Sequence, residues 1–114
     1  MNLITLTTDF GLKDPFVGMM KGVIYSINSA AQIVDISHGI DSQDILEAAF
    51  LISTSYRFFP KGAIHLVIVD PGVGGRRRPI LVTASGHYFI GPDNGVLSWY
   101  IMRCLRHALT VASV

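Results

Sequence analysis

The stretch that decides the fold is Ile64–Pro79, IHLVIVDPGVGGRRRP. It begins with a six-residue run, IHLVIV, that is hydrophobic apart from one histidine and is typical of a buried central strand. The run stops at Asp70-Pro71-Gly72, where a proline without an amide donor and a glycine that tolerates positive φ predict a tight loop. A carboxylate therefore follows the carboxyl end of a buried strand, the edge of open α/β sheets where ligands bind.

The loop after this strand has two interpretations. Asp-Pro-Gly is ordinary turn chemistry, and a basic cluster such as Arg76-Arg77-Arg78 is more often solvated than bound to phosphate. The loop is not a Walker A motif, because no Gly-Lys-Ser/Thr follows, and it lacks the full G-x-G-x-x-G dinucleotide fingerprint. The residues alone therefore leave both a functional Asp70 and a well-made turn open.

Strands and helices alternate up to this stretch. Residues 3–8 and 32–37 predict strands, and apolar residues at helical spacing predict a helix after each, with Asp14 and Ser42 as N-caps. The expected apolar positions are Phe16, Val17, Met20, Val23, Ile24 and Ile27 in the first helix and Ile45, Leu46, Ala49, Phe50 and Ile52 in the second. This order predicts an α/β fold of three layers, with a mostly parallel sheet flanked by helices.

The pattern changes after Pro79. Residues 79–84 and 88–90 flank Ser85-Gly86-His87 and predict a hairpin, followed by a dense turn at residues 91–95. Residues 96–109 have apolar side chains four apart and predict a helix, and residues 110–114 look like a strand that is cut short.

Composition narrows the class of protein. The chain has 114 residues, enough for one domain, and 50% of them are hydrophobic, which is high for a free-standing domain and suggests a covering partner or missing chain. The net charge is only +1, so the composition shows no excess of positive charge that would indicate a nucleic-acid or anionic-membrane partner. The single Cys104, the absence of a run of ~18 apolar residues and the absence of a signal pattern favour the cytoplasm.

One further aspartate and two histidines are candidates for a functional role. Asp9 directly follows the first predicted strand, and a carboxylate can accept two hydrogen bonds at once, which suits a ribose diol, although it might equally cap a turn. His38 and His65 have no recognised metal-ligand spacing, so no metal site is predicted. His65 lies within the central run and is interpreted as a core histidine with satisfied hydrogen bonds.

Four segments together resemble the S-adenosyl-L-methionine (SAM) hydroxide adenosyltransferase family, the hydrolase relatives of the fluorinases and chlorinases. They are TTDFGLKDPFVGMMKGVI (7–24), IVDISHGIDSQDILEAA (33–49), FFPKGAIHLVIVDPGVGGRRRPI (58–80) and FIGPDNGVLS (89–98). Any one of them would be a weak signal, but their order and spacing make the resemblance specific.

The resemblance implies a reaction and a set of site residues. Water would attack the ribose 5′ carbon of SAM, giving adenosine and methionine, with SAM as substrate and no cofactor. Asp70 and Arg77 look like two members of a water-orienting Asp-Arg-His set. Asp9 looks like the residue that grips the ribose hydroxyls, Asp14 would face the methionine ammonium group, and Asn94 is a further substrate-binding candidate.

The chain also departs from the family pattern. The family's histidine, in a segment resembling T-F-H-G-R-D, and its C-terminal β-barrel domain have no counterpart before Val114. Residues 1–114 therefore resemble an N-terminal α/β domain that is incomplete at its C-terminus, and we expect little or no activity from it by itself. Completed, it would be a homotrimer by family resemblance.

Two other classes of function stay open, so whether the chain is itself an enzyme is left undecided. It could be a non-catalytic assembly or binding module, or an inactive fragment, which its apolar composition favours. It could also be another nucleotide-using enzyme whose glycine loop and arginines cradle a phosphate. Asp70 would repel a phosphate in the same loop, which disfavours this last interpretation.

Overall fold

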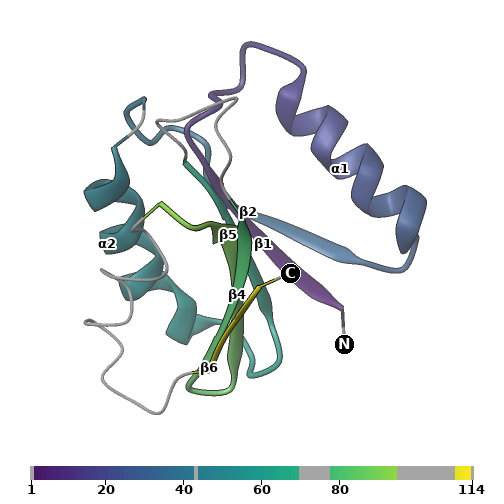
Figure 1. The fold of residues 1–114 in the computed structure, drawn as a ribbon. Coiled ribbons are helices and arrows are strands. Elements are labelled where there is room, and N and C mark those ends of the chain that lie inside the picture. Colours follow the sequence, from purple (N-terminus) through teal and green to yellow (C-terminus); the bar gives the residue numbers. More distant parts are fainter. Residues whose placement is uncertain (1, 43, 70–77, 95–109, 114) are drawn as a thin grey trace.

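The computed structural model describes residues 2–42, 44–69, 78–94 and 110–113. They form one sheet with a helix on each side (Figure 1). Its strands are β1 (Leu3–Thr8), β2 (Gln32–Ser37), β3 (Ile64–Ile68), β4 (Pro79–Ala84), β5 (His87–Pro92) and β6 (Thr110–Ser113). The helices are α1 (Phe16–Ile27) and α2 (Ile45–Ser55), and α2 continues into a short 3₁₀ turn, η1 (Tyr56–Phe58).

The strand order is β2-β1-β3-β5-β4-β6. Strands β2, β1, β3 and β5 are parallel to one another, and β4 pairs antiparallel with both β5 and β6. The chain moves from β1 to β2 in one direction and from β2 back past β1 to β3 in the other. Crossovers of one hand then put α1 and α2 on opposite faces, as Figure 1 shows. The predicted three-layer, mostly parallel α/β fold with a central β3 is confirmed.

The predicted hairpin joins β4 to β5. Ser85 and Gly86 both have positive φ, 53° and 80°, as a two-residue turn of this kind requires, and Ala84 pairs with His87 on either side of it. Strand β5 is longer than predicted. Gly91 and Pro92, expected in the following turn, pair with β4 instead.

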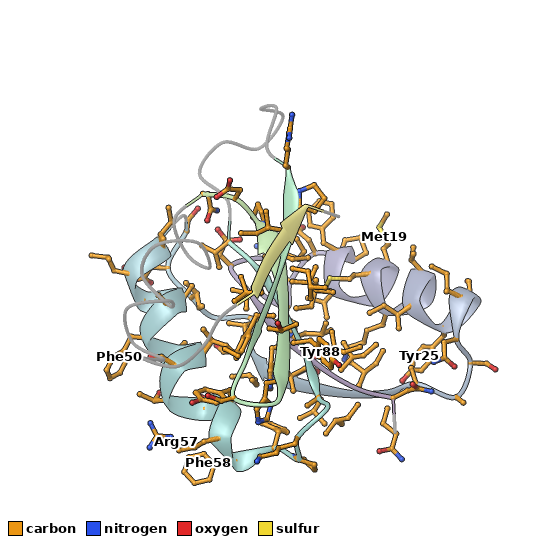
Figure 2. All side chains as sticks on the ribbon, turned by 60° about the horizontal axis from the view of Figure 1, so that its bottom comes forward. Met19, Tyr25, Phe50, Arg57, Phe58 and Tyr88 are labelled. Atoms are coloured by element: carbon orange, nitrogen blue, oxygen red, sulfur yellow. The ribbon has the colours of Figure 1, made fainter. Side chains whose placement is uncertain are left out.

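Helix α2 covers the main core. Its buried residues Ala48, Ala49 and Ile52 pack in one cluster with residues that include Val67 of β3 and Phe89 of β5. Small alanine side chains let the helix approach the sheet closely. The prediction that Leu46 and Phe50 belong to the buried face is wrong, because both are 62% exposed. Figure 2 shows Phe50 pointing outward.

The N-cap predicted for this helix is also wrong. Asp44, not Ser42, is the N-cap: its side chain accepts a hydrogen bond of 3.0 Å from the amide of Glu47. A side chain that accepts from the third residue of a helix satisfies one of the amides left without an intrahelical partner. Ser42 lies two residues earlier and is exposed.

Helix α1 covers the opposite face less fully. It begins at Phe16, and Pro15 rather than Asp14 takes the N-cap position, with its carbonyl accepting from the amide of Met19 at 2.9 Å. Asp14 as N-cap was therefore wrong. Val17 is the helix's buried residue, and Met20 and Ile24 on the same stripe are half-buried. The remaining predicted apolar positions, Phe16, Val23 and Ile27, are exposed.

The predicted helix over residues 96–109 lies outside the described residues, and so does the loop at 70–77 that holds Asp70 and Arg77. Within the described part of the chain, neither helix has the length and apolar character needed to cross a membrane.

Candidate functional site

The candidate site lies at the carboxyl ends of the parallel strands. Strand β1 ends at Thr8 and Asp9 follows it, while Thr8 pairs with Ile68, the last residue of β3. From this point β1 leads to one edge of the sheet and β3 leads to the other. Such a reversal of direction is where open α/β sheets bind ligands. Asp70, the second predicted carboxylate, follows Ile68 by two residues in the sequence, and its own position lies outside the described residues.

Asn94 is held at the same edge. Its side-chain nitrogen donates a hydrogen bond to the carbonyl of Val69, the residue before Asp70. The amide of Asp93 donates to the carbonyl of Arg78 at 2.9 Å. These bonds tie the turn after β5 to the end of β3 and to the start of β4. Asn94 therefore has a structural task here, and its predicted contact with substrate stays a prediction.

The loop that carries Asp9 is fixed by its backbone. The amide of Phe10 donates to Thr8 Oγ1 at 3.2 Å, and the amide of Gly11 donates to the carbonyl of His38 at 2.8 Å. Gly11 has a φ of +70°, a conformation that a glycine adopts without strain. Both amides that follow half-buried Asp9 are therefore held in place.

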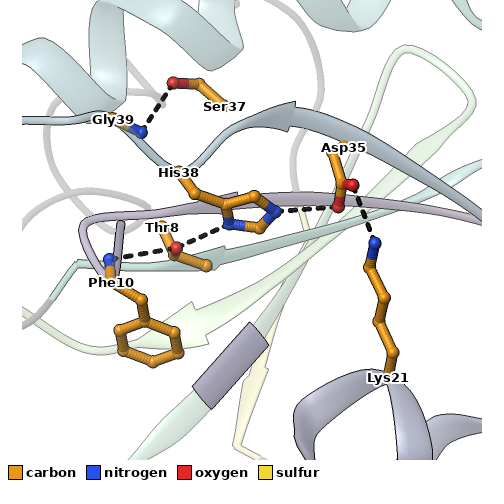
Figure 3. Close-up of polar contacts among 7 residues, drawn as sticks. All are labelled: Thr8, Phe10, Lys21, Asp35, Ser37, His38 and Gly39. Atoms are coloured by element: carbon orange, nitrogen blue, oxygen red, sulfur yellow. Dashed lines mark hydrogen bonds and ion pairs between the residues drawn. The ribbon is translucent and has the colours of Figure 1, made fainter. Parts of the chain in front are cut away.

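A chain of side chains extends from this loop across β2 to α1 (Figure 3). Thr8 Oγ1 lies 2.7 Å from His38 Nδ1, and His38 Nε2 lies 2.8 Å from Asp35 Oδ1. Lys21 Nζ donates to the other oxygen of Asp35, Oδ2, at 2.7 Å. Thr8 is fully buried and His38 is 6% exposed, so these two groups interact away from water.

The hydrogens of this chain follow from its partners. A neutral His38 must carry its proton on Nε2, because a lone pair there would face the carboxylate of Asp35. His38 Nδ1 then accepts from the Thr8 hydroxyl, which leaves Thr8 Oγ1 to accept from the Phe10 amide. Donors and acceptors match at each step, an arrangement in which neighbouring hydrogen bonds strengthen one another. We call Lys21, Asp35, His38 and Thr8 the loop-supporting chain.

Asp35 is the charged end of this chain. Partial burial raises the pKa of Asp35, but hydrogen bonds from Lys21 and His38, together with their charges, more than offset this and hold the pKa below its usual value. Asp35 is therefore ionised near neutral pH and accepts from both of its neighbours.

The other predicted site residues are less constrained. Asp14 is exposed on the segment that leads from Asp9 to α1. Asp70 and Arg77 lie outside the described residues, so of the predicted set the structure places Asp9 and Asn94 at the same edge of the sheet. The loop-supporting chain was not predicted from the sequence, in which the spacing of His38 only argued against a metal site. The available signal was Asp35, a charged residue inside a predicted strand, three positions before His38.

A second polar cluster lies at the opposite end of the strands. Thr5 Oγ1 is 2.7 Å from His65 Nδ1, and His65 Nε2 is 3.0 Å from His87 Nδ1, near the first residues of β3 and β5. His65 is fully buried and its ring stacks on Phe89 at 5.1 Å between centroids. Burial, reinforced by the charge that His87 would carry, lowers the pKa of His65 to about 4. The prediction of a satisfied core histidine is confirmed.

Among the described residues, the carboxylates of Asp41, Asp44 and Glu47 also gather. Their contacts are those of a helix start: Asp44 caps α2, and Glu47 accepts from the amide of Asp41 at 3.2 Å. This is a capping arrangement and needs no ion to explain it.

Comparison with known proteins identifies the family. The profile of the SAM hydroxide adenosyltransferase N-terminal domain matches residues 4–112. A protein of Methanocaldococcus jannaschii named (R)-S-adenosyl-L-methionine hydrolase is 42% identical over an alignment of 104 residues that covers 87% of this chain and 39% of the relative. A protein of Thermus thermophilus with the same name is 38% identical over an alignment of 104 residues that covers 89% of this chain and 40% of the relative.

Halogenating relatives and a solved structure agree with this. A fluorinase of Actinoplanes is 28% identical over 122 residues, covering 87% of this chain and 41% of its own. The crystal structure of an uncharacterized conserved protein from Thermotoga maritima superposes with a TM-score of 0.89 at 35% identity, over 97% of this chain and 42% of the other. The chain thus spans about two fifths of the length of these relatives. It belongs to the SAM hydroxide adenosyltransferase family and corresponds to the N-terminal domain of that family.

Proposed function

We propose that this chain is the N-terminal part of a SAM hydrolase and supplies the residues that hold the adenosyl group and orient the attacking water. The observation that carries the proposal is Asp9, a carboxylate at the carboxyl end of β1 beside the end of β3, in a chain of the SAM hydroxide adenosyltransferase family. Relatives that are 38% and 42% identical bear the name (R)-S-adenosyl-L-methionine hydrolase, which supports this choice of substrate.

Each predicted site residue has a role in the proposal. The carboxylate of Asp9 accepts hydrogen bonds from the two ribose hydroxyls, and Asp14 faces the ammonium group of the methionine moiety. Asp70 accepts a hydrogen bond from the attacking water, and Arg77 keeps that carboxylate ionised and oriented through a charge-assisted pair. Asn94 holds the end of β3 and contacts the substrate.

The chemistry suits a site built of carboxylates and hydrogen-bond donors. Water forms a bond to C5′ while the bond from C5′ to the sulfonium sulfur breaks, and the electron pair of that bond leaves with methionine. One proton of the water passes to solvent, so the products are adenosine, methionine and a proton. The cationic sulfur is already an activated leaving group, so no acid has to protonate it. Holding water and substrate in line can supply about 7–11 kcal/mol of the lowered barrier.

The proposal extends to assembly and location. We propose a homotrimer that acts in the cytoplasm, as the family resemblance and the single cysteine suggest. The proposal concerns the protein at its natural length.

The proposal can be tested by isotope labelling. The natural-length protein is incubated with SAM in water enriched in oxygen-18, and the products are analysed by mass spectrometry. We expect adenosine with the label in its 5′ hydroxyl and methionine without it. Asp70→Ala should abolish the reaction, and Asp9→Asn should raise KM by about 10- to 100-fold, because it weakens charge-assisted hydrogen bonds to the ribose.

The matched control is Asp41→Asn, which neutralises an exposed carboxylate before α2 and should leave KM unchanged. Adenosine formation that survives Asp70→Ala would contradict the proposed role of that residue. Thermal stabilisation by ATP but not by SAM or adenosine would contradict the substrate class and favour a different nucleotide-using enzyme.

A second candidate function is a non-catalytic assembly module. The specific observation in its favour is the exposed apolar stripe of α1, where Phe16, Val23 and Ile27 are 52%, 61% and 83% exposed. Labelled adenosine that is released by the protein of natural length, and is lost in Asp70→Ala, would rule this candidate out.

A further inference from the structure

His38 is linked to two successive backbone amides of the loop that carries Asp9. The His38 carbonyl accepts from the Gly11 amide, and its ring is linked through Thr8 Oγ1 to the Phe10 amide. Two successive amides after Asp9 therefore depend on His38. The Asp9 carboxylate can accept hydrogen bonds from both hydroxyls of a ribose only while the backbone of the loop keeps it in one orientation.

The ring of His38 is in turn fixed from its other side. His38 Nε2 contacts Asp35, and Lys21 of α1 holds the second oxygen of the same carboxylate. Because Asp35 stands on β2, Thr8 on β1 and Lys21 on α1, the chain joins three elements behind the loop (Figure 3). A salt bridge as exposed as that of Lys21 and Asp35 adds little stability by itself, but it restricts the carboxylate that orients the histidine.

We infer that the loop-supporting chain, Lys21-Asp35-His38-Thr8, positions the Asp9 carboxylate for recognition of a vicinal diol such as that of ribose. This inference rests on the proposed function, because it takes Asp9 to be the group that meets the ribose. In this inference the four residues act on the substrate indirectly. They are positioning residues that act through the Phe10 and Gly11 amides.

Thr8 and its neighbour Thr7 provide a matched pair for testing this. Both are fully buried on β1, and successive strand residues point to opposite faces. The Thr8 hydroxyl joins the chain, whereas in the described part of the structure the Thr7 hydroxyl has no hydrogen-bond partner. Thr8→Val and Thr7→Val are therefore the same substitution, and valine keeps nearly the shape of threonine. Thr8→Val removes the link between His38 and Phe10, whereas Thr7→Val leaves it in place.

The measurement is the ratio of the dissociation constants for 2′,3′-dideoxyadenosine and adenosine, determined by calorimetry on the natural-length protein. An unfolded fraction weakens the apparent binding of both nucleosides equally, so the ratio reports only on how the folded site meets the diol. We expect the wild-type protein to prefer adenosine by on the order of 100-fold, since two hydrogen bonds to a carboxylate are lost with the dideoxy compound.

Thr8→Val should reduce this preference to within about tenfold, because the Phe10 amide loses its acceptor while the bond from Gly11 remains. Thr8→Ser, which keeps the hydroxyl, should restore it, and Thr7→Val should leave it unchanged. These three results together would support the positioning role, because a simple loss of stability would not produce this pattern.

Each contrary outcome has its own meaning. A wild-type protein with no preference for adenosine would overturn the role of Asp9, and with it both the proposed function and this inference. A wild-type preference that Thr8→Val retains would overturn the positioning role alone. An equal loss of preference in Thr7→Val and Thr8→Val would also overturn it, because any change at the end of β1 would then suffice.

Discussion

Single buried hydroxyls distinguish neighbouring residues of β1. Thr5, Thr7 and Thr8 are all fully buried, yet their hydroxyls differ in what they contact. Thr5 is paired with His65 and Thr8 with His38 and Phe10, while Thr7 has no partner among the described residues. Burial of an unpaired hydroxyl costs free energy, whereas a paired one roughly recovers that cost. The hydroxyl of Thr7 should therefore lower the stability of the fold, whereas removal of the hydroxyl of Thr5 or Thr8 should be destabilising.

At this scale we predict that Thr7→Val raises the free energy of unfolding by about 1 kcal/mol, because valine keeps the shape of threonine and removes the unpaired hydroxyl. Thr5→Val is the control on the same face of the same strand. It leaves His65 Nδ1 without its partner and should lower the free energy of unfolding by about 1–3 kcal/mol. Urea unfolding measures both, and a loss of stability in Thr7→Val would show that its hydroxyl does have a partner.

The helices show what the sequence can and cannot predict about elements. Strand and helix positions followed from hydrophobic periodicity, and β3 was correctly placed at the centre of the sheet. The buried face of α2 was predicted in part: Ala49 and Ile52 are buried as expected, but Leu46 and Phe50 are exposed, because apolar residues surround the helix. The helix lies close to the sheet, so small side chains such as Ala48 and Ala49 fit between them and Phe50 does not. The distance between helix and sheet is set by the tertiary structure and cannot be predicted from the sequence of the helix.

The same reason limits what the sequence predicts about the site. Asp9 was a candidate because it directly follows a strand, which is a local signal. The loop-supporting chain was not predicted, because Thr8 and His38 are 30 positions apart and meet only when β1 and β2 pair in one register. Lys21 and Asp35, 14 positions apart, meet only when α1 lies across β2.

For the start of α2 we predict that Asp44→Ala lowers the free energy of unfolding by about 1 kcal/mol, because the Glu47 amide loses its acceptor. Ser42→Ala, at the position that the sequence favoured, should change it by less than about 0.5 kcal/mol. Thermal or urea unfolding of the two variants side by side measures this. Equal losses would mean that Ser42 shares the capping role.

The whole molecule has two polar ends with different tasks. The carboxyl ends of the parallel strands carry Asp9 and Asn94, and the opposite end carries the buried pair His65 and His87. Core residues of β3 and β5, such as Val67 and Phe89, lie between them. A change at the histidine end should therefore reach the site only through the stability of the entire domain.

The last prediction uses this separation. Burial lowers the pKa of His65 from 6.5 to about 4, so between these values the unfolded chain binds a proton that the folded chain does not. The stability that His65 gives is complete above about pH 6.5 and is lost as the pH falls toward 4, by on the order of 3 kcal/mol. The pKa of His87 is also lowered, by burial and then by the charge of Lys61, so its effect has the same sign.

Urea unfolding between pH 4.5 and 7.5 should show this loss. Near pH 5, His65→Phe should reduce the slope of the free energy of unfolding against pH by the equivalent of about one bound proton. This change in slope is expected whether or not the substitution also changes the stability itself. In the folded protein, the same variant should keep the wild-type preference for adenosine over 2′,3′-dideoxyadenosine, because His65 lies at the far end of the strands. An unchanged slope would show that His65 is not the titrating group. A reduced preference would show that the two ends of the sheet are coupled within the folded state.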